Sequence, residues 1–273
     1  MINLTKNLNF QPEEILMSKY FKVVISNKYV EIIKQANSPI TKRTSSGGRK
    51  SYSSLNSENY DVNVKISITR ARRKIRRLLE CNFTDKYAFV TLTFAASEAV
   101  DITNINSCNK IFADFKKRLA YYLEKNQLPK FKYLGVIEFQ DKFRQGAIHY
   151  HIVCNLTEIP NEILQGLWQH GFFHKINISS GATENEKIAF YLKKGITDPR
   201  LNGHKRYFHS HGLKQPITLE FDNPDEFYKY LDECNSTLLE GGTYLTPFTG
   251  ETKYENYYVE NVKELMEYVQ DLR

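Results

Sequence analysis

Apolar and polar residues alternate along several short stretches of the chain, and this period of two is typical of β-strands. The alternation predicts a hairpin over residues 20–36 that turns at Asn27-Lys28. It predicts further strands over residues 87–94, 131–140, 147–155 and 172–178.

Apolar residues that recur every three or four positions predict helices between these strands. The predicted helices cover residues 104–124, 160–168 and 184–194. From residue 87 the order is β-α-β-β-α-β-α, and its first six elements match the split β-α-β arrangement. We therefore expect an α+β fold of the ferredoxin-like kind, an antiparallel sheet with helices on one face. Such a sheet leaves its other face open, and this face often binds nucleic acid.

Two basic segments precede this region. Residues 67–80 form a predicted amphipathic helix with six cations and one terminal acid, which favours contact with phosphates over a merely solvated face. The six cations are Arg70, Arg72, Arg73, Lys74, Arg76 and Arg77. Residues 37–60 predict a mobile loop with basic positions over 42–50. The loop lacks the spacing of a phosphate-binding loop, so no nucleotide-hydrolysing motor is expected.

The charge divides the 273-residue chain unevenly. Residues 1–80 hold 16 Lys+Arg against 6 Asp+Glu, and residues 215–273 hold 4 against 13. A basic front suggests a polyanionic partner. We expect three parts: an N-terminal hairpin with a basic loop (1–64), a central domain with its preceding basic helix (65–216), and an acidic helical C-terminal region (217–273).

Several classes of protein are excluded. The four cysteines form no Cys-x-x-Cys pair, which argues against a disulfide framework or a zinc ribbon. No apolar run reaches the roughly 18 residues of a membrane span, and the first residues lack a signal-peptide pattern. We expect a cytoplasmic protein with no membrane partner.

The stretch Ala147–Val153 contains His149 and His151 in strand alternation, so both imidazoles point to one face. An isolated pair of this kind is often structural, but two neutral imidazoles on a rigid strand are also half of a divalent-metal site.

A carboxylate is expected beside this pair. If the turn 141–146 joins the two middle strands, Glu138 lies opposite His149, and opposed residues are about 5 Å apart. A carboxylate in an apolar strand is costly unless it is paired or binds a cation. The set of Glu138, His149 and His151 suits Mg²⁺ or Mn²⁺, with Gln140 as a further contact. A simple salt bridge of Glu138 remains the alternative.

Other polar residues are less specific. Thr91 and Thr93 share one face of the first strand, where they either position phosphate or are ordinary strand threonines. His209 with His211, or His170 with His174, are alternative metal pairs, but no carboxylate or cysteine lies near either in the sequence.

The helix 184–194 supplies a candidate nucleophile. Tyr191 lies between Lys187, four residues before it, and Lys194, three residues after it, on one helical surface. A free phenol has a pKa near 10, and we expect these cations and a nearby metal to favour the phenolate.

Three segments in this order resemble the motifs of HUH endonucleases, the rolling-circle replication initiators of plasmids, phages and small circular DNA viruses. They are residues 90–94, residues 146–153 and residues 189–194. Residues 205–216 are also similar to a segment that follows the tyrosine motif in bacterial and phage members. The resemblance spans residues 65–216.

The resemblance implies roles for matching positions. His149 and His151 correspond to the metal-binding pair, Glu138 to a third ligand, Tyr191 to the nucleophile that becomes joined to a DNA 5′-phosphate, and Lys194 to the motif lysine. Position 190 is Phe and no second tyrosine lies a turn away, so the chain resembles a single-tyrosine member. The implied partners are single-stranded or supercoiled origin DNA, a host helicase and a host polymerase.

Two other interpretations stay open. A mobilisation relaxase or a single-strand transposase would use the same chemistry, although relaxases usually carry a third histidine that this motif lacks. A non-catalytic nucleic-acid-binding module could use the same open sheet.

Overall fold

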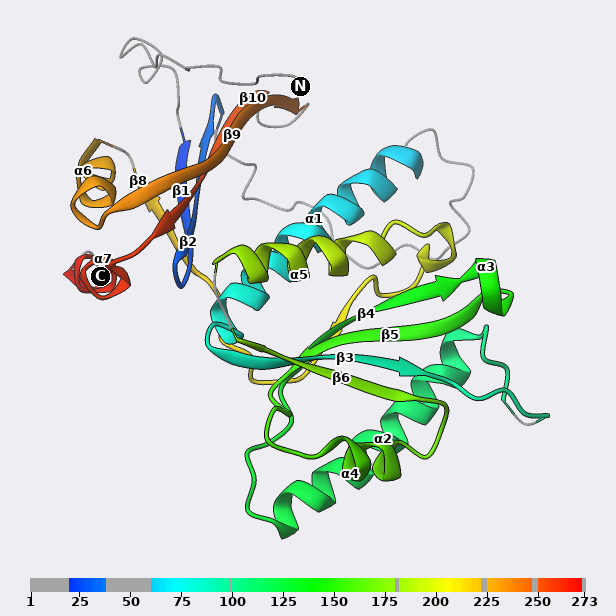
Figure 1. Ribbon diagram of the computed structural model, residues 1–273. Helices are drawn as coiled ribbons and strands as arrows, with labels where there is room; N and C mark the ends of the chain where they lie inside the picture. Colours follow the sequence, from blue (N-terminus) through cyan, green and yellow to red (C-terminus); the bar gives the residue numbers. More distant parts are fainter. Residues whose placement is uncertain are drawn as a thin grey trace, which may run out of the picture. The chain divides into compact units, whose positions relative to one another are not determined.

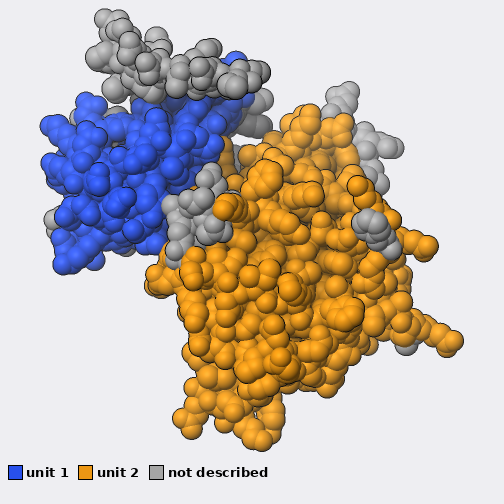
Figure 2. Space-filling model, viewed as in Figure 1, with its two compact units in different colours: residues 1–48, 216–273 blue, residues 49–215 orange. Residues whose placement is uncertain are grey.

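The computed structural model describes residues 20–37, 60–98, 100–179, 182–221, 225–246 and 250–271. The chain divides into two compact units (Figure 2), and each is described by itself. Unit 1 comprises residues 1–48 and 216–273, and unit 2 comprises residues 49–215.

The sheet of unit 2 has the order β6-β3-β5-β4-β7, with antiparallel neighbours throughout. Its strands are β3 (Lys86–Thr93), β4 (Tyr133–Gln140), β5 (Ala147–Cys154), β6 (Phe173–Ser179) and the short β7 (Phe208–His209). The first four strands lie in the order of a split β-α-β unit, with β5 inserted between β3 and β4. The α+β class and the predicted strands are confirmed.

Helices pack on both faces of this sheet (Figure 1), which differs from the one-sided arrangement expected from the sequence. The helices α2 (Ile105–Lys125) and α4 (Asn161–Trp168) cover one face, and their core includes Phe115 and Trp168. On the other face, α1 (Tyr60–Asn82) and α5 (Ala182–Gly195) bury Ile75, Leu192 and their neighbours against the sheet. An apolar stripe on a basic helix must be buried somewhere, and here the face that was expected to be open buries it.

The helix α1 begins seven residues before its expected start at residue 67. Its first turns bury no side chain, and burial begins at Ala71. The apolar period therefore identified only the packed part of the helix. Local hydrogen bonding also forms a short helix α3 (Asp141–Arg144) inside the expected turn and a 3₁₀ helix η3 (Pro199–Leu201).

Unit 1 joins both ends of the chain in one antiparallel sheet of order β8-β1-β2-β10-β9. The expected hairpin is confirmed as β1 (Tyr20–Ser26) and β2 (Tyr29–Gln35), with Asn27 left-handed at φ 57°. The C-terminal part is only partly helical, contrary to expectation. Between and beside α6 (Asp225–Glu233) and α7 (Val262–Asp271) lie β8 (Ile217–Phe221), β9 (Ser236–Thr246) and β10 (Gly250–Val259).

The expected basic loop over residues 42–50 lies outside the described residues. Within the described part of the chain, no helix is both long and apolar enough to cross a membrane.

Candidate active site

The β4–β5 hairpin places the predicted residues side by side. Glu138 pairs with His149 and Val136 with His151, which is the register expected from the sequence. On its other edge β5 pairs with β3, so that His149 lies beside Thr93 and His151 beside Thr91. Residues opposed in a sheet share a face. Two histidines, one carboxylate and two threonines therefore occupy one face of three strands.

His151 is held from two directions and is only 4% exposed. Its Nε2 lies 2.5 Å from Oε2 of Glu138, and its Nδ1 lies 3.1 Å from the Thr91 hydroxyl. The hydrogen bond from His151 outweighs partial burial and holds the pKa of Glu138 below its ordinary value. At neutral pH Glu138 is therefore an ionised carboxylate with an oriented imidazole beside it.

His149 is placed differently, next to a cation. Its Nε2 lies 3.4 Å from Nη1 of Arg144, and Nη2 of the same guanidinium donates to the Phe94 carbonyl at 3.0 Å. Burial, with smaller contributions from His151 and Arg144, lowers the pKa of His149 to about 4. His149 is therefore neutral at pH 7, which is the form that binds a metal ion.

Tyr191 of α5 joins this group from above the sheet. Its ring centroid lies 5.1 Å from that of His151 and 5.4 Å from that of Phe89, edge to face in both cases. Phe89 in turn stacks on His151 at 5.9 Å. The ring is packed on one side, while Tyr191 as a whole remains 43% exposed.

Burial and the negative charge of Glu138 raise the pKa of Tyr191. We expected the two lysines to lower it, so this expectation is wrong for the protein by itself. The charge of Lys194 acts instead on Glu138, whose pKa it helps to lower. Activation of the phenol thus needs a positive charge brought by the ligand or by a metal ion.

Gly195 explains how α5 comes so near. A Cβ at this position would lie 2.6 Å from the Ile137 carbonyl oxygen, closer than real contacts allow. The sequence suggested a helix C-cap at Gly195. The residue is the last of α5 and is absent from the residues with positive φ, so the close approach to β4 is its structural reason.

The side chains are chemically suited to Mg²⁺ or Mn²⁺, since they offer one ionised carboxylate and two imidazoles on a common face. Gln140 adds an amide, whose Nε2 donates to Glu138 at 3.1 Å. In the arrangement seen, however, Glu138 binds His151 directly. Among the described residues no group of three His, Cys, Asp or Glu side chains is arranged to hold a metal ion. That statement covers the alternative pairs His209 with His211 and His170 with His174.

The two threonine hydroxyls are engaged within the protein. Thr91 contacts His151, and the Thr93 hydroxyl accepts a hydrogen bond from the Phe172 N–H at 2.6 Å. Both threonines therefore have structural roles that the sequence did not separate from phosphate binding.

The cations proposed for DNA contact differ in exposure. Arg70 and Arg72 of α1 and Lys187 of α5 are exposed. Arg73, Lys74, Arg76 and Arg77 are partly buried. Arg76 forms an ion pair with Glu80 at 2.9 Å, and Lys74 donates to Gln215 at 2.5 Å.

Two residues of the site escaped the sequence reasoning. Arg144 lies in the hairpin turn, where a basic residue is common, and Phe89 lies in an apolar strand. The signal for Phe89 was the alternation that places it on the same face as Thr91. Arg144 could be found only once α3 was known to fold back toward His149.

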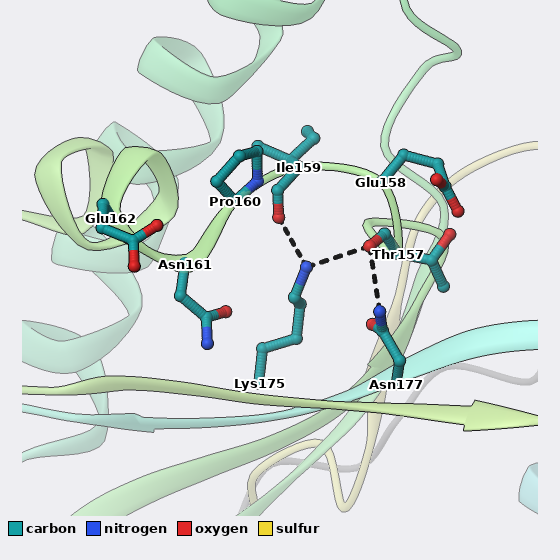
Figure 3. Close-up of a pocket in the computed structure, with 8 residues that line it drawn as sticks. All are labelled: Thr157, Glu158, Ile159, Pro160, Asn161, Glu162, Lys175 and Asn177. Carbon is teal, nitrogen blue, oxygen red and sulfur yellow. Dashed lines mark hydrogen bonds between the residues drawn. The ribbon is translucent and has the colours of Figure 1, made fainter.

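A separate polar hollow of about 350 Å³ lies between β6 and the segment that leads into α4 (Figure 3). Lys175 extends into it and donates to the carbonyl oxygens of Leu156, Thr157 and Ile159. Lys175 pairs with Val90 of the α2–α4 core face, so the hollow is on the other side of the sheet from Tyr191. It is not part of the candidate site.

Residues 87–196 match the family model of replication-associated proteins of the ORF2 type. The matched stretch runs from β3 to the residue after α5 and contains Glu138, His149, His151, Tyr191 and Lys194. It supports a protein of the replication-initiator type.

No curated protein matches the chain. Among solved structures, the chain is similar to the crystal structure of the hypothetical protein ORF119 from Sulfolobus islandicus rod-shaped virus 1. The identity is 12% over 45% of this chain and 91% of the other, with a TM-score of 0.29.

Proposed function

We propose that unit 2 is an HUH-type replication initiator that nicks one DNA strand at an origin of rolling-circle replication in a plasmid or phage. The observation that carries the proposal is the contact of the Tyr191 ring with the Glu138–His151 pair, inside a stretch that matches a replication-associated family. A half-exposed tyrosine beside an ordered carboxylate and two imidazoles suits attack on a phosphodiester.

The reaction is an exchange of phosphodiester bonds. The Tyr191 oxygen forms a bond to phosphorus and the bond from phosphorus to the 3′-oxygen breaks. The proton lost by the phenol is balanced by the proton gained on the leaving 3′-oxygen. The products are a protein joined to the 5′-phosphate and a free 3′-hydroxyl, which would prime a host polymerase after a host helicase opens the duplex.

The other side chains take supporting roles in the proposal. Glu138, His149 and His151 would hold Mg²⁺ or Mn²⁺, which when bound polarises the scissile phosphate. Thr91 orients His151 through its Nδ1. Lys194, with Lys187 beside it on α5, offsets negative charge that develops on the phosphate oxygens. Arg70 and Arg72, with the partly buried cations of α1, would contact the DNA backbone.

Trapping of the covalent product tests the proposal without knowledge of the origin sequence. The protein is incubated with a randomised single-stranded DNA library and Mn²⁺, denatured in detergent, and the DNA that remains attached is sequenced. We expect the wild type to retain a narrow set of sequences and Tyr191→Phe to retain none.

Tyr121→Phe is the matched control, because Tyr121 is 69% exposed on α2, a helix of the opposite face. It should form the adduct as the wild type does. Equal adduct from Tyr191→Phe would refute the assignment of the nucleophile. DNA binding without any adduct would favour a non-catalytic module. A narrow preference for transfer-origin or transposon-end sequences would favour a relaxase or transposase.

A further inference from the structure

Large apolar side chains are exposed on the edge strand of the sheet in unit 2. Phe172 is 76% exposed and Ile176 is 52% exposed. His174 lies between them and is also exposed. Alternation along β6 puts all three on one face, and Ile176 pairs with Phe89 and His174 with Thr91. They therefore lie on the face that carries Tyr191, in the part that α5 leaves uncovered.

The exposed ring of Phe172 is carried by a fixed backbone. Thr93 N–H donates to the Phe172 carbonyl at 3.0 Å, and Phe172 N–H donates to the Thr93 hydroxyl at 2.6 Å. The preceding Gly171 packs so tightly that a Cβ there would overlap the Thr93 carbonyl oxygen. A frayed strand end would let the ring turn inward, whereas this end is pinned at two hydrogen bonds with the ring in solvent.

The position of Phe172 relates it directly to the candidate site. Phe172 lies beside Thr93, Thr93 pairs with His149, and His149 pairs with Glu138, so these residues form one row across the sheet. Neighbouring strands are about 4.8 Å apart, which places Phe172 about 10 Å from His149 along the row. This is a short step for a single strand whose phosphate lies near Tyr191.

Unit 2 also carries the charge that a nucleic acid requires. Its sequence, residues 49–215, holds 27 Lys+Arg against 15 Asp+Glu, a net charge of +12. A fixed, solvent-facing aromatic ring in a cationic unit is poorly suited to a further apolar protein surface and well suited to a base, because each base offers a π-face and each phosphate a negative charge.

We propose that Phe172, flanked by His174 and Ile176, is a base-stacking platform that holds an unpaired nucleotide of the DNA strand next to the nicked phosphate. The inference rests on the proposed function and specifies how the single strand is held there. Stacking on Phe172 does not depend on base identity, so the platform contributes affinity and selection against paired DNA, and base recognition belongs elsewhere.

Fluorescence of a tryptophan placed in the platform tests the proposal. The chain has one native tryptophan, Trp168, which is fully buried, so its emission serves as a constant background. We expect the emission of Phe172→Trp to be quenched when oligo-dT is added, and the emission of Tyr121→Trp to be unchanged. A duplex of the same length should give little quenching, since its bases are already stacked.

Affinity gives the second measurement. By fluorescence anisotropy of labelled oligo-dT, Phe172→Ala should weaken binding about ten-fold, the loss typical of one stacked base, while Tyr121→Ala should bind as the wild type does. The inference is overturned if saturating oligo-dT leaves Phe172→Trp unquenched, if the duplex quenches it equally, or if Phe172→Ala binds with wild-type affinity.

Failure of this inference is distinguishable from failure of the proposed function. Oligo-dT binding does not require cleavage, so Tyr191→Phe in the Phe172→Trp background should show the same quenching. Adduct without quenching would overturn the platform alone. Quenching without adduct from any library sequence would leave the platform and remove the nicking activity.

Discussion

At the scale of single residues, Thr91 controls the imidazole that contacts both Glu138 and Tyr191. Its hydroxyl lies 3.1 Å from Nδ1 of His151 and can donate or accept a hydrogen bond. It can therefore hold the ring in one orientation whether the proton is on Nδ1 or on Nε2. Residues that orient a metal-binding histidine in this way typically change metal affinity by about 10- to 100-fold.

We expect Thr91→Val to lower the affinity for Mn²⁺ about ten-fold while the fold is unchanged, because the isosteric side chain keeps the volume and loses the hydrogen bond. Titration calorimetry with Mn²⁺ measures the affinity, and circular dichroism checks the fold. Thr91→Ser keeps the hydroxyl and should bind as the wild type does. Wild-type affinity in Thr91→Val would show that the hydroxyl does not position His151.

At the scale of elements, the end of α5 is fitted to β4 by the missing side chain of Gly195. We expect Gly195→Ala to lower the free energy of unfolding by about 1–3 kcal/mol, because the added methyl group overlaps the Ile137 carbonyl. Gly166→Ala is the matched control. Nothing lies within 4 Å of a Cβ at that helical position, so alanine should stabilise the protein by about 0.5–1 kcal/mol. Urea unfolding measures both; equal effects of the two substitutions would contradict the close-approach argument.

A second link between elements joins the hairpin turn to η3. Arg200 contacts Asp198 at 2.7 Å and Asp141 at 2.8 Å, and its guanidinium lies 4.0 Å from the Phe139 ring centroid. Asp198 also accepts the Arg200 N–H at the start of η3. The cation therefore fixes both the strand end that carries Glu138 and the turn that carries Arg144.

This link has a defined pH dependence. Hydrogen bonds from Arg200 lower the pKa of Asp198 in the folded protein, so the unfolded state takes up its proton first as the pH falls. The stabilisation is complete at neutral pH and is lost as the pH falls below about 4 through the lowered pKa. Asp198→Asn keeps a cap but removes the charge, and should cost about 1 kcal/mol at pH 7. Unfolding curves of both proteins at pH 7 and pH 3 check this; a cost that is larger at pH 3 would contradict it.

Local sequence patterns predicted the elements of unit 2 and the register around Glu138, because strand alternation and a short turn leave one pairing that keeps the histidines and the carboxylate on one face. They did not predict that α1 and α5 share this face, since an apolar stripe does not identify the surface that buries it. They also failed for β8, β9 and β10, which alternate with acidic helices; β8 and β10 pair with strands about 200 residues away. Such long-range pairing leaves no local signature.

At the scale of the whole molecule, the two units differ in charge. Residues 49–215 carry a net +12, while residues 1–48 and 216–273 together hold 11 Lys+Arg against 16 Asp+Glu, a net −5. The polyanion partner inferred from composition therefore belongs to unit 2. Contacts to phosphates release counterions, so binding should weaken steeply as salt is added.

Arg70 and Arg72, the exposed cations of α1, provide the test. We expect the double variant Arg70→Gln, Arg72→Gln to reduce the slope of log affinity against log salt by about 1, since each phosphate contact on a single strand contributes about 0.7. Anisotropy of labelled oligo-dT over a salt series measures the slope. Lys117→Gln with Lys125→Gln on α2 changes the same net charge on the opposite face. If that control changed the slope as much, α1 would have no specific role.

The central claim is that Tyr191 becomes covalently joined to DNA. The most direct measurement traps the adduct formed from single-stranded DNA and Mn²⁺, digests it with nuclease and protease, and locates the attached nucleotide by mass spectrometry. The account predicts a nucleotide joined through its 5′-phosphate on the peptide that contains Tyr191. Attachment to another residue, or unmodified Tyr191 in material that has cleaved DNA, would contradict it.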